Sequence, residues 1–372
     1  MPFAAHACSS RFCISRGACV LLLFAVALLA GCQSDDNADD AFIHQLQGET
    51  MGTTWSVQLL APVDPANDLT QSALRGLRDD DQSVVSLLAE LQPVLDAELL
   101  RINALMSTWD PESELSLFNR RRMVEPITLH ADTIDVIETA RTISHLTQGR
   151  YDITLSPVIQ LWGFGTQLKT GVPTNDEVAT AMESVGSALL VRRGNTLRKR
   201  HPMLSVDVSS LGKGFAVDQL GVVLESFGIT NYLAEIGGEL RARGSRLDGL
   251  PWRVGIEQPN GDIEEGLYLH NTHVASSGSY RNYREEGGKR ISHIIDGSTG
   301  RPIDHQLVAV TVIHESTMLA DGWATALLVV GEAAAKKLIE QLGLDAQLTI
   351  RTDDDFELYR SDGFQQRLVE SL

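Results

Sequence analysis

Cysteine is nearly absent from this sequence, and where it occurs matters more than how often. All four cysteines of the 372-residue chain lie within its first 32 residues, at positions 8, 13, 19 and 32. The region after Cys32 can therefore form no disulfide of its own, hold no cysteine-ligated metal and offer no cysteine nucleophile. The Gly-x-Ser-x-Gly elbow, the His-Glu-x-x-His zinc motif and the Gly-x-Gly-x-x-Gly dinucleotide fingerprint are missing too.

Positive charge is also scarce. The chain has 31 Lys and Arg against 49 Asp and Glu, a formal net charge of −18 at pH 7. A general nucleic-acid-binding protein needs a basic surface, so this balance argues against that class. Aromatic residues make up only 6%, but hydrophobic residues make up 43%, which is ordinary for a globular protein with one or two domains.

Residues 18–30 form the apolar run that stands out near the start of the chain. The run is too short to span a bilayer comfortably, and it follows Arg11 and Arg16, as in a secretory signal peptide. It ends in Leu29-Ala30-Gly31-Cys32, which resembles the bacterial lipobox, whose cysteine becomes the lipid-bearing first residue. The alternative is an ordinary signal peptide with an incidental cysteine.

We expect residues 1–31 to be a signal peptide, Cys32 to be lipidated, residues 32–41 to form the lipidated N-terminus and tether, and residues 42–372 to fold. This predicts a lipoprotein of the bacterial cell envelope that faces the periplasm and is attached to a membrane by its lipid anchor. Gln33 and Ser34, directly after the cysteine, stand in place of the aspartate associated with inner-membrane retention, which favours the outer membrane.

The region expected to fold contains both strand and helix patterns. Residues 203–206, 215–227 and 232–240 have the apolar spacing of a strand, a helix and a strand, which fits a crossover unit. Pro93 interrupts a leucine-rich helical pattern, which predicts a helix that starts after the proline and leaves open a shorter, separate helix before it. With further hairpin signals, we predict an α+β fold with mixed, largely antiparallel sheets and packed helices.

The stretch from Asp207 to Asp218 contains Gly212-Lys213-Gly214 between an expected strand and an expected helix. A tight turn there would expose helix N-terminal amides beside the Lys213 charge, a setting suited to a phosphate. A plain glycine-rich connection with a surface lysine is an equally good interpretation.

Asp321 and Thr325 would lie one turn apart on an apolar helix. A buried carboxylate needs a partner, and carboxylate with hydroxyl is a ligand set that suits Mg²⁺; the alternative is that Asp321 caps the helix. His293, at the end of an expected strand, is either a general base or a structural histidine. For Trp109, core packing is favoured over a role as a stacking platform.

A series of motifs in order along the chain resembles the ApbE family of flavin transferases. They are Met51-Gly52-Thr53; 106–109 with 113–115 and Asn119; 151–154 with Pro157 and 162–163; 207–218; 236–239; 276–278; 293–300; and 320–326. The resemblance covers nearly all of residues 48–345.

The resemblance implies a periplasmic, Mg²⁺-dependent FAD:protein FMN transferase. Such enzymes split FAD, attach FMN by a phosphoester bond to a Ser or Thr of a partner protein, and release AMP. The partners are subunits of redox-driven ion pumps and other respiratory flavoproteins. By matching motifs, the FAD site would include Met51, Trp109, Arg150, Tyr151, Asp152, Asp207, Lys213 and Ile295. Mg²⁺ would bind the side chains of Asp321 and Thr325 and the carbonyls of Ser210 and Ala324, with His293 as base and Lys213 at the reacting phosphate.

The sequence departs from the family pattern at a few positions. Gly297 stands where proline is usual, Ser279 where an acidic or amide residue is frequent, and Gly212 where alanine is common. These departures leave two alternatives open, an FAD pyrophosphatase in which water replaces the acceptor hydroxyl and a flavin-binding lipoprotein without catalysis.

Overall fold

The computed structural model describes residues 43–60, 82–165, 171–280, 282–353 and 355–369. The expected signal peptide, the lipidated Cys32 and the tether lie outside the described residues. The described residues belong to one compact unit, Asp40–Leu372. Among them, no helix is both long and apolar enough to cross a bilayer.

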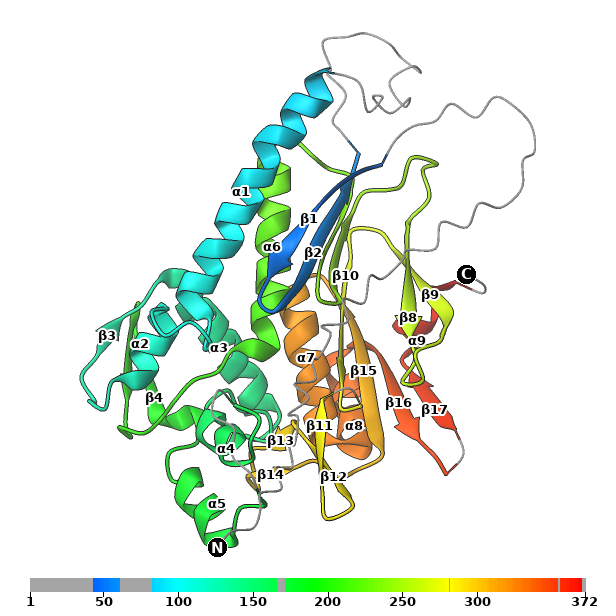
Figure 1. Cartoon of the computed structure of the whole chain (residues 1–372). Helices are drawn as coiled ribbons and strands as arrows, with labels where there is room; N and C mark the ends of the chain where they lie inside the picture. The colour runs from blue at the N-terminus through cyan, green and yellow to red at the C-terminus, as the bar shows by residue number, and fades with distance from the viewer. Residues whose placement is uncertain (1–42, 61–81, 166–170, 281, 354, 370–372) are drawn as a thin grey trace, which may run out of the picture. The chain divides into compact units, whose positions relative to one another are not determined.

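An eight-stranded sheet forms the centre of this unit, and all of its neighbouring strands are antiparallel (Figure 1). Its order is β1 (His44–Thr50), β2 (Thr53–Leu59), β6 (Tyr232–Ile236), β7 (Glu239–Arg243), β10 (His273–Gly278), β15 (Leu307–His314), β16 (Asp345–Arg351) and β17 (Phe356–Arg360). The predicted α+β class with largely antiparallel sheets is confirmed.

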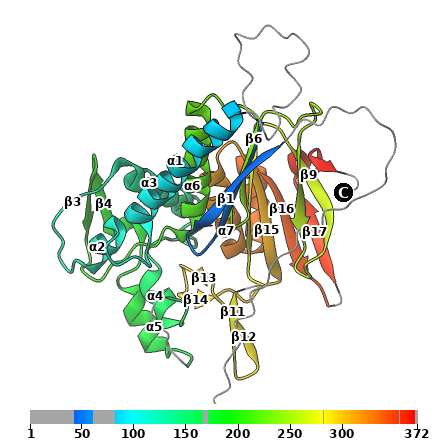
Figure 2. The ribbon, with the colours of Figure 1, turned by 45° about the horizontal axis from the view of Figure 1, so that its top comes forward.

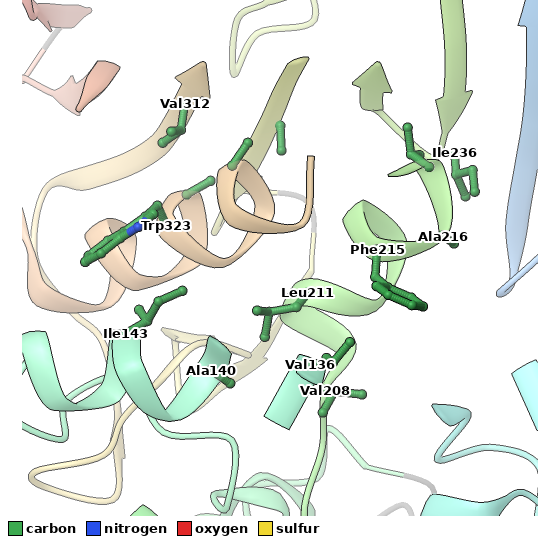
Figure 3. Close-up of a cluster of buried hydrophobic side chains, with 14 of the residues drawn as sticks. Val136, Ala140, Ile143, Val208, Leu211, Phe215, Ala216, Ile236, Val312 and Trp323 are labelled. Atoms are coloured by element: carbon green, nitrogen blue, oxygen red, sulfur yellow. The ribbon is translucent and has the colours of Figure 1, made fainter. Parts of the chain in front are cut away.

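Helices cover one face of this sheet. Figures 1 and 2 show α6 (Ser209–Ser226) and α7 (Thr317–Val330) packed against it, with α1 (Gln82–Met106) alongside α6. Helix α3 (Ala131–Leu146) packs against both α6 and α7, and α8 (Glu332–Leu342) packs on β16. Figure 3 shows the resulting core, in which Trp323 of α7, Leu211 of α6 and Val312 of β15 lie among fully or nearly fully buried side chains.

The other face of the sheet packs on a smaller sheet of β8 (Trp252–Glu257), β9 (Ile263–Leu269) and β18 (Leu368–Val369), together with α9 (Asp362–Gln365). Strand β6 shows why two cores form. Its Tyr232 and Ala234 belong to the helix-side core, whereas Leu233 between them belongs to the other, as expected from alternating side chains on a strand.

The remaining elements surround the helices. A three-stranded sheet contains β3 (Ile127–Thr128), β4 (Leu190–Arg193) and β5 (Thr196–Lys199). Two short ladders pair β11 (Tyr283–Glu286) with β12 (Lys289–Ser292) and β13 (Ile295–Asp296) with β14 (Arg301–Pro302). The short helices are α2 (Glu114–Arg120), α4 (Ser156–Leu161), α5 (Asn175–Met182) and the 3₁₀ turn Ser187–Leu189.

Two local predictions are wrong. Helix α1 runs through Pro93 without a break, because Leu91, Leu95 and Leu99 form one buried stripe whose packing outweighs the cost of the proline. Residues 203–206 are not a strand, and β6 pairs antiparallel with β2, so the predicted crossover unit does not exist. Val206 instead exchanges its backbone hydrogen bonds with the side chain of Asn119.

Candidate functional site

Two glycines allow α6 and α7 to approach closely. A Cβ on Gly214 would lie 2.4 Å from the carbonyl oxygen of Thr317 on α7, and one on Gly322 would lie 3.1 Å from the side chain of Leu211 on α6. The sequence predicted a tight turn at Gly212 and Gly214 before the helix. Helix α6 instead begins at Ser209, so both glycines lie inside the helix. The glycines thus bring the first turns of α6 beside Asp321 of α7.

A cleft of about 1020 Å³ opens at this contact. It is lined by both helices, β10, the 293–295 segment and the 108–111 loop. The predicted site residues that line it are Trp109, Tyr151, Asp152, Asp207, Ser210, Lys213, His293, Ile295, Asp321 and Thr325. Trp109 is 72% exposed, so the preference for core packing at this position is wrong.

Asp321 is a deeply buried acid of the cleft, 3% exposed. Its Oδ2 accepts a hydrogen bond of 3.1 Å from the amide of Gly214, and it forms no ion pair with any described residue. Burial raises its pKa well above the usual value, and the nearby Glu239 raises it further. A carboxylate held this way is destabilised until a cation reaches it.

Other residues of the cleft near Asp321 carry oxygen atoms that suit a metal ion. One turn further along α7, the hydroxyl of Thr325 shares a hydrogen bond of 2.9 Å with that of Ser277 on β10. Ala324 is fully buried and can offer only its backbone carbonyl. On α6, the hydroxyl of Ser210 shares a 2.7 Å hydrogen bond with Tyr151, whose pKa is raised by burial.

The donor chemistry of this corner fits a hard cation. The described residues contain no group of three or more His, Cys, Asp or Glu side chains placed to hold a metal. A metal between α6 and α7 would therefore need hydroxyl, carbonyl or water oxygens besides Asp321. Such an all-oxygen set suits Mg²⁺, which also keeps several waters.

Lys213 and Glu239 form a second charged feature of the cleft. The Lys213 ammonium lies 2.6 Å from Glu239 Oε1, and Glu239 is 1% exposed. Its other oxygen, Oε2, is buried without a hydrogen-bond partner. Burial alone would lower the pKa of Lys213, but Glu239 and Asp321 raise it, so this lysine remains an ammonium.

His293 has the tautomer that a base requires. Its Nδ1 lies 2.7 Å from the carbonyl oxygen of Asn282, and a carbonyl only accepts, so Nδ1 carries the proton and Nε2 keeps its lone pair. Burial lowers the pKa of the ring, which keeps it neutral. Phe164 packs edge-on against it, with ring centroids 6.3 Å apart.

Two residues predicted for the FAD site, Arg150 and Met51, do not line the cleft and instead contact other parts of the fold. Arg150 is bound to Asp296 at 2.6 Å and donates to the carbonyls of Val329 and Val330, so it holds the end of α7 and does not line the cleft. Met51 does not line it either. It sits in the β1–β2 turn with a φ of +51° and packs on the core.

Two of the lining carboxylates are also engaged by neighbouring groups. Asp152 accepts hydrogen bonds from Thr154, Ser144 and the amide of Ser187. Asp207 accepts one from the amide of Ser209 at 2.9 Å, at the start of α6.

Sequence reasoning assigned no site role to Glu239 or Asp218. Asp218 of α6 accepts hydrogen bonds from the first turn of α7, from Ser316 Oγ and from the amides of Thr317 and Met318, at 2.8–3.1 Å. It thereby fixes the start of the helix that carries Asp321. Both acids lie in apolar stretches of the sequence. A carboxylate in such a stretch is often buried and paired, and this was the sequence signal that could have identified them.

Comparisons with known proteins agree on one family. The sequence profile of the ApbE family matches residues 51–348. The FAD:protein FMN transferase of Vibrio cholerae is 38% identical over 93% of this chain and 97% of its own length, and that of Haemophilus influenzae is 38% identical over 93% and 96%.

Solved structures agree with the sequence relatives. The flavin transferase ApbE from Vibrio cholerae superposes with a TM-score of 0.76 at 37% identity, covering 88% of this chain and all of that one. The apo flavinyl transferase ApbE of Pseudomonas stutzeri also gives a TM-score of 0.76, at 31% identity, with 88% and 96% coverage. This chain belongs to the ApbE family.

Proposed function

We propose that this protein is a Mg²⁺-dependent FAD:protein FMN transferase. The observation that carries the proposal is the presence, in one cleft, of a buried carboxylate without an ion pair, Asp321, and an ammonium, Lys213. A diphosphate needs its charge neutralised from both sides. The relatives named FAD:protein FMN transferase, 38% identical over most of the chain, support the same activity.

Asp321, Thr325 and the carbonyls of Ser210 and Ala324 would hold Mg²⁺. When bound, the ion neutralises diphosphate charge and favours departure of the leaving phosphate. Lys213, held by Glu239, would face the same phosphates with a positive charge. The large cleft and its exposed Trp109 offer apolar surface for the flat rings of FAD.

The acceptor hydroxyl attacks the phosphorus of the FMN half. Its oxygen forms the new phosphoester bond, the phosphorus–oxygen bond to AMP breaks, and AMP leaves with the bridging oxygen. His293 Nε2 takes the hydroxyl proton, because Nδ1 is engaged by the Asn282 carbonyl.

The proposal extends to the cellular setting. Cys32 would carry the lipid that anchors the protein to an envelope membrane, with the folded region in the periplasm. The acceptor would be a flavoprotein of a respiratory or ion-pumping redox complex. Retention of radiolabelled fatty acid by the wild type, but not by Cys32→Ser, tests the anchor.

The activity is tested with the full chain, FAD, Mg²⁺ and candidate acceptors, by following acceptor-bound flavin fluorescence and AMP release. Acceptor labelling with an equal amount of AMP is the expected result. AMP and FMN released without an acceptor would identify a pyrophosphatase. FAD that stays intact through prolonged incubation with acceptor would contradict catalysis.

A further inference from the structure

An unusual stretch of surface borders the cleft where α2 ends. Residues 120–126 are exposed without interruption and begin with three arginines. Arg120 and Arg122 line the cleft. Arg120 is paired with Glu112 at 3.4 Å, whereas Arg121 and Arg122 have no ion pair or side-chain hydrogen bond with any described residue. On a chain with a net charge of −18, unpaired positive charge beside the cleft calls for an explanation.

A buried lysine lies beneath these arginines. The Lys199 ammonium donates to the carbonyls of Asn119 and Arg121 at 3.0 and 3.1 Å and lies 4.8 Å from the Phe118 ring centre. It is 1% exposed and has no carboxylate partner among the described residues. Burial, aided by the charge of Arg122, lowers its pKa to about 8. The fold thus keeps a costly cation here that adds to the local positive potential.

The segment is also held firmly. Asn119 lines the cleft and bonds both the carbonyl and the amide of Val206, at 2.7 and 2.8 Å. Together with the Lys199 contacts, this fixes the end of α2 relative to the segment that leads into α6. The backbone at the start of the exposed segment is therefore fixed, and a partner has to order mainly the side chains that project from it.

Apolar side chains accompany the arginines. Met123 is 61% exposed and Met203 is 48% exposed, and Met203 and Trp109 both line the cleft. Methionine, arginine and tryptophan are the residues enriched in protein–protein interfaces, where lysine and glutamate are depleted. The composition therefore favours a protein partner, and the positive charge favours an acidic one.

We propose that Arg121, Arg122, Met123 and Met203, here named the rim, bind an acidic segment of the acceptor protein and deliver its hydroxyl to the cleft. This inference rests on the proposed transferase function. The position of the rim supports it, because Arg122 and Met203 line the cleft and Arg121 and Met123 adjoin Arg122 in the chain. An acceptor must reach the cleft, whereas a membrane laid on the same surface would cover it. A local basic rim would also offset the repulsion between an acidic acceptor and this acidic chain.

The chain offers a matched control. Arg198 and Arg200 are exposed, do not line the cleft and have no ion pair with any described residue. They flank Lys199 in sequence, so their side chains project from the opposite face of β5. The variants Arg121→Glu/Arg122→Glu and Arg198→Glu/Arg200→Glu carry the same change in charge on opposite faces of one small sheet.

Binding is measured by fluorescence anisotropy with the full chain and a short peptide that has one threonine between aspartates. Its counterpart with asparagines is the second probe, and vesicles with and without phosphatidylglycerol are the third. We expect Arg121→Glu/Arg122→Glu to weaken binding of the aspartate peptide about tenfold or more and to remove its salt dependence. The Arg198→Glu/Arg200→Glu control should stay within about twofold of the wild type.

The inference is overturned if the wild type does not prefer the aspartate peptide, or if both double variants bind it equally. It is also overturned if the rim variant loses affinity for anionic vesicles or for FAD while keeping its affinity for the peptide. If the rim variant misfolds by circular dichroism, Arg121→Gln alone gives the same comparison with a smaller expected loss. Failure of the wild type to transfer FMN, with rim-dependent peptide binding intact, would count against the proposed function and not against the rim.

Discussion

Replacing Gly214 by alanine should separate α6 from α7. The added Cβ would lie 2.4 Å from the carbonyl oxygen of Thr317 and 2.8 Å from Cα of Met318. Both atoms belong to the backbone of the first turn of α7, so no side-chain rotation relieves the overlap. Overpacking of this kind costs about 1–3 kcal/mol, and better helix propensity returns about 1 kcal/mol at most.

Gly212 provides the opposite case on the same helix. A Cβ at this position meets no atom within 4 Å, so Gly212→Ala should be stabilising by about 0.5–1 kcal/mol. Urea unfolding followed by circular dichroism should place the two variants on opposite sides of the wild type. Gly214→Ala should also lose transfer activity by about a hundredfold, since displacing α7 by an ångström misplaces Asp321.

A Gly214→Ala protein as stable and as active as the wild type would show that this close contact between α6 and α7 does not position Asp321. A Gly212→Ala protein that is destabilised as much as Gly214→Ala would contradict the role of this contact as well, because the contrast between open space and backbone contact would then have no effect.

Four further outcomes follow from the site. Asp321→Asn keeps an acceptor for the Gly214 amide but removes the buried charge, so it should abolish Mg²⁺-dependent transfer while leaving the metal-free protein at least as stable in thermal unfolding. Burial lowers the pKa of His293 below 6.5, so transfer should fall only as the pH drops through that lowered value, and His293→Gln should remove this acid limb from the pH–rate profile. Glu239→Gln should let burial depress the Lys213 pKa, moving the alkaline limb of the same profile to lower pH. Asp218→Asn weakens the cap of α7, which costs about 1 kcal/mol in unfolding measurements and should raise the Mg²⁺ concentration needed for half-maximal rate.

Local patterns predicted much of the fold. Thr174 and Glu177 have the sequence spacing of a capping box, and both capping hydrogen bonds form at the start of α5. Gly194 and Asn195 are a hairpin signal in the sequence, and β4 and β5 pair on either side of them. The errors arose where tertiary packing overrides local preference. Helix α1 continues through Pro93 because its buried leucines pack in the core. In residues 203–206, the backbone of Val206 forms hydrogen bonds with the side chain of Asn119, a distant partner that no local pattern reveals.

The residues of the cleft were predictable to the extent that they follow a motif. Lys213, His293, Asp321 and Thr325 do meet in one cleft. Pairing between distant segments was not predictable in the same way, because the partner of Lys213 is 26 residues away, on another element. Arg150 shows the converse: its position in a motif does not reveal that Asp296 and the end of α7 occupy its guanidinium.

The central claim is that a divalent cation held by Asp321 and Thr325 faces Lys213 across the diphosphate of FAD. It is tested most directly by anomalous diffraction from crystals soaked with Mn²⁺ and FAD. The account predicts an anomalous peak at the side chains of Asp321 and Thr325, with the diphosphate between that peak and the Lys213 ammonium. A peak elsewhere in the cleft, or a diphosphate bound away from Lys213, would contradict it.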